Sequence, residues 1–270
     1  MGDIMRKNSY QGNLYLFEGI DGAGKTSQAQ MLTDRLGHEG HRAFFTREPT
    51  SETVFGNLAR FIYMCESLHE KASAELRRCM AGAEYQALRG VYDNLQKVHI
   101  GRFESIAHEV MMGEYKNLPT FLQLCMIFDR YHHYVDTIIP KLKEGITVVA
   151  DRGFLSTLAY SAADDIAWLP LLAAHREILG DAFIMPDILF FIDVPVEIGI
   201  QRTMAKQQGK KDYFDTSELL TKIRDRYLQL CSSPIIADNT QVIAIRAGDA
   251  SPHETHEEIW PCVEQLLARF

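Results

Sequence analysis

The sequence lacks the features that mark several protein classes. No apolar segment among its 270 residues approaches the ~18 residues needed to cross a bilayer. The first residues carry no apolar core typical of signal peptides, and Arg6 breaks the pattern required for N-myristoylation. The five cysteines show no CxxC spacing, so neither a zinc site nor a disulfide framework is predicted. We therefore expect a cytoplasmic protein with reduced thiols and no membrane partner.

An excess of basic residues is also missing. The formal net charge is -8 and the isoelectric point is about 5.7. Proteins dedicated to nucleic-acid polymers usually present a basic face, so no such partner is expected. An acidic total still permits a local cationic pocket for a small anion. Hydrophobic residues make up 46% of the chain, which is enough to build a sizeable core.

Short apolar runs, bounded by polar or turn residues, indicate buried parallel strands. The predicted strands are Leu14–Glu18, Arg42–Thr46, Thr147–Asp151, Ile188–Asp193 and Gln241–Ile245. Amphipathic stretches alternate with them, and the predicted helices are Thr26–Gly37, Arg130–Leu142, Ser217–Leu230 and His253–Phe270. This alternation predicts an α/β fold, a doubly wound parallel sheet flanked by helices, as one domain over residues 1–270. Ligands of such sheets bind at the carboxyl ends of the strands.

Residues 61–118 interrupt the alternation because they contain almost no strand-like run. Within them, residues 72–90 and 91–115 are predicted to form two helices. We therefore predict a helical insertion beside the sheet. A lid or a partner surface is one interpretation of this pair, and a pair of helices that simply packs is the more economical one.

The most specific motif runs from Gly19 to Thr26 and fits GxxxxGK[ST], with a predicted strand before it and a predicted helix after it. Glycines let backbone N–H groups turn towards a phosphate, and the following helix adds its positive N-terminal end. Lys25 is placed to bridge the β- and γ-phosphates and Thr26 to ligate Mg²⁺. No NKxD stretch for guanine is present, which favours ATP over GTP. The predicted ATP-binding residues are Gly19, Gly22, Ala23, Gly24, Lys25, Thr26 and Ser27.

Two further acidic residues end predicted strands. Asp151 stands where a second metal-directed carboxylate belongs in such folds, and Arg152 follows it directly. The alternative for Asp151 is a helix cap or turn residue, but an adjacent arginine aimed at the same sheet edge favours an anion site. Asp193 also ends a strand, and with Pro195 close behind it a structural role is the preferred interpretation.

Four segments together resemble the thymidylate kinases, in particular those of the bacterial type. They are LFEGIDGAGKTSQ, FTREPT, MIFDRYHHYVDTIIPKLKEGITVVADRGFLSTLAYS and PDILFFIDVPVEIGIQR. Their order and spacing match from Leu14 to about Leu230, apart from the helical insertion. The resemblance implies a P-loop kinase that uses ATP and Mg²⁺ to phosphorylate a deoxynucleoside 5′-monophosphate, dTMP in the first instance. It also implies a homodimer.

The resemblance assigns catalytic roles to matching positions. Lys25 would hold the ATP phosphates, and Asp21 would meet the 3′-hydroxyl of the acceptor sugar. Arg47 and Arg152 would grip the acceptor phosphate. Glu18 matches an acid that the family places near the reaction centre. Independent chemistry agrees, because two polyanions must meet and cations reduce their repulsion.

The base-binding part departs from the family pattern. Arg130 matches the arginine that hydrogen-bonds the base, and Tyr160 matches the aromatic that disfavours ribose. Met126, however, replaces a phenylalanine that stacks on thymine, and Ser161 replaces a glutamine that reaches towards the base. These changes predict a base specificity shifted from dTMP. The predicted acceptor-binding residues are Arg47, Arg60, Met126, Arg130, Arg152, Thr157, Tyr160 and Ser161.

The lid expected over residues 203–216 has no arginine, although family members of the bacterial type carry arginines there. Lys206, Lys210 and Lys211 are the cations that could close on the γ-phosphate, and the sequence does not choose among them.

Two rival functions are a kinase for an unphosphorylated small molecule or nucleoside and a regulatory nucleotide-binding protein without catalysis. Arg47 and Arg152 disfavour the first rival, while the missing lid arginine is the best support for the second.

Overall fold

Five parallel strands form the central sheet of the computed structural model, which describes residues 6–64, 68–83, 85–86, 94–112, 114–206 and 216–267. The strand order is β3-β4-β2-β6-β7, so β2 lies in the middle. The strands are β2 (Leu14–Glu18), β3 (Ala43–Arg47), β4 (Thr147–Asp151), β6 (Ile188–Asp193) and β7 (Gln241–Arg246). A separate two-stranded pair joins β1 (Arg6–Lys7) to β5 (Ile184–Met185).

The strands form where apolar and β-branched residues can be buried on both faces of the sheet. All five residues of β2 are buried, as are those of β4. The register pairs Phe17 with Asp151 and Arg47 with Asp151, which brings the polar strand ends to one edge. The chain leaves β2 towards β3 on one side and returns at β6 on the other, so a crevice opens beyond the end of β2.

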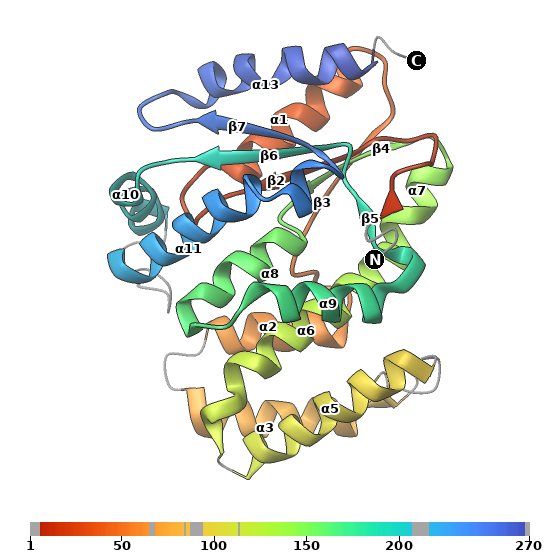
Figure 1. The fold of residues 1–270 in the computed structure, drawn as a ribbon, viewed down its shortest axis with the longest axis vertical. Coiled ribbons are helices and arrows are strands. Elements are labelled where there is room, and N and C mark those ends of the chain that lie inside the picture. The colour runs from red at the N-terminus through yellow and green to blue at the C-terminus, as the bar shows by residue number, and fades with distance from the viewer. Residues whose placement is uncertain are drawn as a thin grey trace.

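Helices cover both faces of this sheet, which confirms the predicted doubly wound α/β fold. In Figure 1, α1 and α13 lie on one side, and α8 and α11 lie on the other. The helices are α1 (Lys25–His38), α2 (Val54–Met64), α3 (Leu68–Ala81), α5 (Asn94–Met111), α6 (Leu118–His133), α7 (Ile139–Lys143), α8 (Phe154–Tyr160), α9 (Trp168–Leu179), α10 (Val196–Lys206), α11 (Ser217–Cys231), α12 (Pro234–Ala237) and α13 (Pro252–Leu267). In the described part of the chain, none has the length and apolar content needed to span a bilayer.

The predicted insertion contains α3 and α5, which form the layer furthest from the sheet in Figure 1. Aromatic rings attach it to the rest of the molecule. Phe103 of α5 lies edge-on to Phe55 of α2, with 5.4 Å between centroids, and stacks on Phe121 of α6 at 4.7 Å. Buried aromatic pairs of this kind add to the free energy gained by burial of their surface. The two helices therefore share a core with the helices that flank the site.

Several predicted boundaries differ from the observed ones. The helix predicted at Arg130–Leu142 begins twelve residues earlier, with Pro119 in its first turn, where a missing N–H costs little. It continues through a π-helical turn, Tyr134–Ile138, into α7, whose Pro140 cannot donate a helical hydrogen bond. Helix α9 was not predicted at all. The final helix, α13, is described only to Leu267, so the last residues of its predicted range lie outside the described chain.

Candidate active site

The segment between β2 and α1 turns back sharply because two of its glycines adopt left-handed conformations. Gly22 has φ +74° and Gly24, the N-cap of α1, has φ +96°. The loop also lies against α10. A Cβ atom on Gly22 would stand 2.1 Å from the carbonyl oxygen of Gly199, so only glycine fits there. This loop therefore presents its backbone to the crevice at the N-terminal end of α1.

Lys25 is the cation at the base of this loop. Its side chain is buried, and Nζ donates a hydrogen bond to the carbonyl of Ile20 at 2.8 Å. Burial, and then the nearby charge of Arg152, lower the pKa of Lys25 to about 8. An anion placed against Nζ would favour the charged form, so this lysine is suited to a phosphate.

Thr26 and Asp151 form a pair suited to a divalent cation. The Thr26 hydroxyl donates to Asp151 Oδ2 at 2.5 Å. Asp151 Oδ1 is buried and has no hydrogen-bond partner among the described residues. An unpartnered buried carboxylate oxygen beside a hydroxyl, next to a phosphate loop, fits Mg²⁺, which binds to few protein oxygens together with phosphate oxygens. The described residues contain no cluster of three acidic, His or Cys side chains that would hold a metal unaided.

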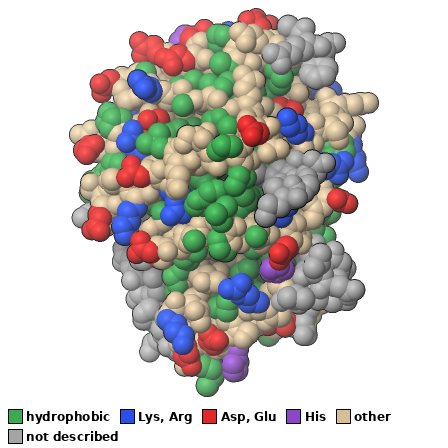
Figure 2. All heavy atoms as spheres, viewed as in Figure 1, with side chains coloured by type: hydrophobic (Ala, Val, Ile, Leu, Met, Phe, Trp, Pro, Cys, Tyr) green, Lys and Arg blue, Asp and Glu red, His purple; other side chains and the backbone are tan. Residues whose placement is uncertain are grey.

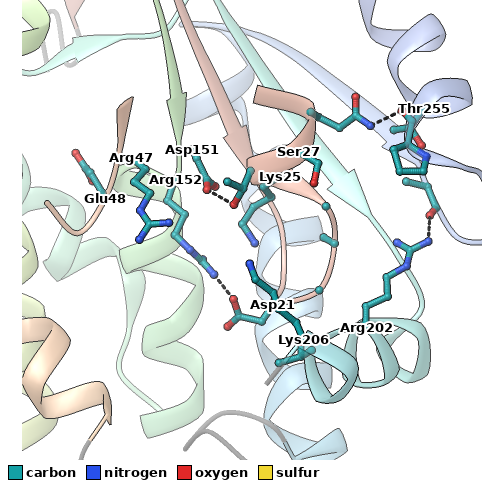
Figure 3. Close-up of a pocket in the computed structure, with 18 of the residues that line it drawn as sticks. Asp21, Lys25, Ser27, Arg47, Glu48, Asp151, Arg152, Arg202, Lys206 and Thr255 are labelled. Atoms are coloured by element: carbon teal, nitrogen blue, oxygen red, sulfur yellow. Dashed lines mark hydrogen bonds and ion pairs between the residues drawn. The ribbon is translucent and has the colours of Figure 1, made fainter. Parts of the chain in front are cut away.

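A cleft of about 730 Å³ opens in front of the loop. Figure 3 shows Arg47 and Arg152 side by side at one end, Arg202 at the other, and Lys206 extending from α10 towards the loop. Arg47 and Lys206 make no hydrogen bond or ion pair with the other described residues, so both are available to an anion. The predicted residues that line the cleft are Asp21, Gly22, Ala23, Gly24, Lys25, Thr26, Ser27, Arg47, Arg60, Asp151 and Arg152.

Arg152 is held between the cleft and a second cavity. Its backbone has φ +71°, which is uncommon outside glycine, and its guanidinium pairs with Asp21. The Tyr160 hydroxyl donates to Asp21 at 2.8 Å, and the Arg152 guanidinium lies 5.0 Å from the centre of the Tyr160 ring. Burial alone would raise the pKa of Asp21, but Arg152 and Lys25 hold it below its usual value. Arginine, carboxylate and phenol are thus fixed relative to one another.

Glu18 lies beneath Arg152 and lines neither cavity. Its carboxylate accepts hydrogen bonds from the backbone N–H groups of Gly153 and Ser156, at 2.9 and 3.2 Å. The hydroxyls of Ser156 and Tyr227 donate to its other oxygen, at 2.5 and 3.0 Å. Burial raises its pKa to about 7, while the Ser156 hydrogen bond acts in the opposite direction. Glu18 therefore caps the start of α8 and supports the backbone that carries Arg152.

The second cavity, of about 170 Å³, lies among α6, α8 and the segment after β3. Asp21, Glu48, Pro49 and Arg152 line both this cavity and the cleft, so the two are adjacent. Its remaining lining residues are Met126, Arg130, Gly153, Ser156, Thr157 and Tyr160.

Some predicted site residues lie elsewhere. The Ser161 hydroxyl is buried and donates to the carbonyl of Leu158 at 2.8 Å, outside the residues that line either cavity. Gly19 lines neither cavity, since it packs against the backbone of Ile192. Asp193 is paired with Arg224 at 2.7 Å. Lys210 and Lys211 lie outside the described residues.

Sequence reasoning assigned no role to Glu48, although it lies within the quoted FTREPT segment. Its Oε2 accepts from Arg130 Nε and Nη2, at 2.8 and 2.6 Å, and its Oε1 lies 3.0 Å from His133 Nδ1. Arg60 Nη2 donates to the Pro49 carbonyl at 2.6 Å. The backbone that follows Arg47 is therefore fixed by a buried contact to Arg130 and a partly buried contact to Arg60. The position of Glu48 directly after Arg47 was the available signal.

Asp129 and Arg202 were missed as well. Asp129 Oδ2 accepts from the backbone N–H of Thr50 at 2.8 Å, and its Oδ1 accepts from the hydroxyl of Thr53. Arg202 donates to the Gly248 carbonyl at 2.7 Å and so joins α10 to the segment after β7. Asp129 lies next to Arg130, and Arg202 ends the quoted segment PDILFFIDVPVEIGIQR, so both stood within segments that carry the resemblance.

A phosphate loop at the central strand, an unpartnered carboxylate beside it and a second cation-walled cavity define a P-loop phosphotransferase. The thymidylate kinase family model matches residues 17–100 and 102–259. The chain therefore belongs to the thymidylate kinase family, and it is a nucleoside monophosphate kinase.

Relatives are similar over nearly their whole length. A "Probable thymidylate kinase" of Thermococcus kodakarensis is 30% identical over 93% of this chain and 97% of its own. A second, from Thermococcus onnurineus, is 28% identical over 94% of this chain and 98% of its own. A thymidylate kinase of a Bradyrhizobium strain, ORS 278, is 27% identical over 97% of this chain and 94% of its own. The membership of the thymidylate kinase family and the enzyme class inferred from the four segments are thus confirmed.

Proposed function

We propose that this enzyme transfers the γ-phosphoryl group of ATP to dTMP in the presence of Mg²⁺. The observation that carries the proposal is the pair of adjacent cavities with Arg152 and Asp21 in their common wall. The cleft at the loop suits the ATP polyphosphate, and the small cavity suits the sugar and base of the acceptor. The acceptor phosphate then lies between them, beside Arg47 and Arg152.

In the proposed reaction, an oxygen of the acceptor phosphate attacks the γ-phosphorus, and the bond from that phosphorus to the oxygen bridging to the β-phosphate breaks. ADP leaves with the electron pair. Arg47 and Arg152 reduce the repulsion between the two anions, and Lys25 stabilises charge on the β- and γ-oxygens. Thr26 and Asp151 would hold Mg²⁺, which when bound neutralises phosphate charge. No protein nucleophile is needed, because positioning and charge supply the catalysis.

Asp21 and Tyr160 would bind the sugar of the acceptor nucleotide. Asp21 is ionised and accepts hydrogen bonds, so it suits the 3′-hydroxyl of the acceptor. The Tyr160 ring is fixed by Arg152 and Asp21 and would crowd a 2′-hydroxyl. The proposed acceptor is therefore a deoxynucleotide. Glu18 acts in this scheme by supporting Arg152 rather than by touching substrate.

The base of the acceptor is proposed to contact Met126, Arg130 and Thr157. We expect its selection to be less strict than in a pocket where a phenylalanine stacks on the base. Met126 is a flexible side chain in that position, and the Ser161 hydroxyl is committed to its own backbone. Arg130 offers an N–H donor, which suits a base carbonyl. This supports thymine or uracil over cytosine, with room for a modified pyrimidine.

Lys206 is the proposed lid cation among the described residues, since it lines the cleft and has no partner there. Lys210 and Lys211 stay candidates. Assembly as a homodimer and a cytoplasmic location also stay predictions.

The test is an ADP-release assay of the purified chain with ATP, Mg²⁺ and each of dTMP, dUMP, dCMP and dGMP. We expect turnover with dTMP, measurable turnover with dUMP and little with dCMP or dGMP. Arg152→Ala should lower the rate by about 10³-fold with an unchanged circular-dichroism spectrum. ATP binding without turnover of any monophosphate would overturn the proposal. A rate for dTMP far above that for every other nucleotide would overturn the relaxed specificity alone.

A further inference from the structure

His175 of α9 is a buried histidine that no motif marks. Its side chain is fully buried and lies behind the base cavity rather than in its wall. Its Nε2 is 2.5 Å from Arg130 Nη1, and its Nδ1 is 2.7 Å from the carbonyl of Leu171. A carbonyl only accepts, so Nδ1 carries the proton and Nε2 presents its lone pair to Arg130.

The contacts of Arg130 use nearly all of its hydrogens. A guanidinium has five N–H groups. Nε and Nη2 each donate one to Glu48, and Nη1 donates to Thr157 at 3.1 Å and to His175. Four donors are therefore engaged, and one N–H on Nη2 is left. Because Arg130 lines the base cavity, this single hydrogen is what it offers to a ligand there.

We infer that His175 is a positioning residue for base selection, because it occupies one Nη1 hydrogen of Arg130 and holds the guanidinium plane so that one N–H faces the base. Glu48 holds one edge of the plane and His175 the opposite one. The ligand chemistry that fits is a pyrimidine with a carbonyl at the facing position. The inference rests on the proposed function and adds the residue that orients its base contact.

The neutral state of His175 is part of the arrangement. Burial, followed by the charge of Arg130, lowers the pKa of His175 to about 3. Glu48 faces Arg130 and supplies the negative charge that Arg130 requires, and His133 contacts the other oxygen of Glu48. Neutral His175 accepts a hydrogen bond on the opposite edge and so orients the guanidinium of Arg130. It does this without a second carboxylate, which would compete to pull Arg130 out of the cavity.

The test compares His175→Leu with His175→Gln. Leucine fills most of the space and has no acceptor, whereas the glutamine amide oxygen can replace Nε2. For His175→Leu we expect the KM for dTMP to rise about tenfold, with kcat at saturation within about twofold. The KM for ATP should not change. The ratio of kcat/KM for dTMP to that for dCMP should fall, and His175→Gln should restore most of it.

Glu177→Gln is the matched control, because it lies on the same helix, pairs with His99 at the surface and does not touch Arg130. Its kinetics should equal those of the wild type. A His175→Leu enzyme with unchanged KM and base ratio would overturn the inference, as would an equal fall of kcat for all substrates without rescue by glutamine. Wild type that phosphorylates no monophosphate would instead overturn the proposed function.

Discussion

The two cavities handle charge in opposite ways. The cleft at the loop is lined, among the described residues, by six cationic side chains and three carboxylates, although the chain as a whole carries a net charge of -8. The base cavity has two arginines and two carboxylates, already paired with one another. The cleft therefore requires an anion to complete it, whereas the base cavity selects by shape and hydrogen bonding. Figure 2 shows charges of both signs interspersed over the described part of one face.

The largest expected effect on this contrast between the cleft and the base cavity comes from replacing Lys25. Lys25→Met should lower kcat by about 10³-fold, because a central charge on the transferred phosphoryl group is lost. Binding of dTMP alone, measured by calorimetry, should stay within about twofold of wild type because the base cavity is untouched. A large loss of dTMP binding would show that the two cavities are not separable.

Asp151 tests the metal side of the cleft. Asp151→Asn keeps the shape but removes the negative charge of the carboxylate, whose Oδ1 is buried without a hydrogen-bond partner among the described residues. We expect kcat at fixed Mg²⁺ to fall about 10²-fold and the Mg²⁺ concentration for half-maximal rate to rise. A titration of rate against Mg²⁺, for the variant and for wild type, measures both. An unchanged titration would place the metal elsewhere.

Acid should destabilise the base cavity through His175. Its pKa is about 3 in the folded chain and near 6.5 when unfolded, so the unfolded state binds more protons between these values. Stability thus falls as pH drops from 6.5 towards 3, by about 1.4 kcal/mol per unit. Between pH 7 and pH 5, urea unfolding of His175→Gln should show a loss about 2 kcal/mol smaller than that of wild type. Equal losses would contradict a neutral His175.

Met126 gives the smallest expected effect. Met126→Phe places a ring against the base, and aromatic contacts add about 0.5–1.5 kcal/mol, so the KM for dTMP should fall about twofold to twelvefold. Turnover of bulkier pyrimidines should fall at the same time because the cavity narrows. Steady-state kinetics with dTMP and a 5-substituted dUMP would measure both. A higher KM for dTMP would mean that Met126 does not face the base.

The same comparison explains what the sequence could predict. The loop from Gly19 to Thr26 is contiguous, so its glycines, its lysine and its flanking elements appear together in one motif. The base cavity draws Glu48, Met126 and Thr157 from three separate segments, and His175 reaches Arg130 behind it from a fourth, so only tertiary packing brings them together. A resemblance supplied some of these positions, but the partner of Arg130 on α9 carries no local mark.

Helices α6 and α9 near the base cavity were not predicted correctly, and the reason is physical. The first part of α6 is buried on nearly all sides, so apolar residues follow one another without the 3.6-residue period of a surface helix. In α9 the buried residues do recur at helical spacing, but two positions obscure the pattern, because Leu169 is exposed while His175 is buried. Amphipathic periodicity reports burial on one face alone, so it is lost where a helix lies inside the protein and is weakened where a histidine takes a buried position.

The close approach of Gly22 to Gly199 ties the fate of two distant sequence segments together. A Cβ atom on Gly199 would stand 2.8 Å from the Asp21 carbonyl, so neither residue can gain a side chain while the other stays in place. The phosphate loop and the helix that carries Arg202 and Lys206 are thus packed backbone to backbone and must move together. A side chain added at either glycine would therefore displace the loop and the helix together.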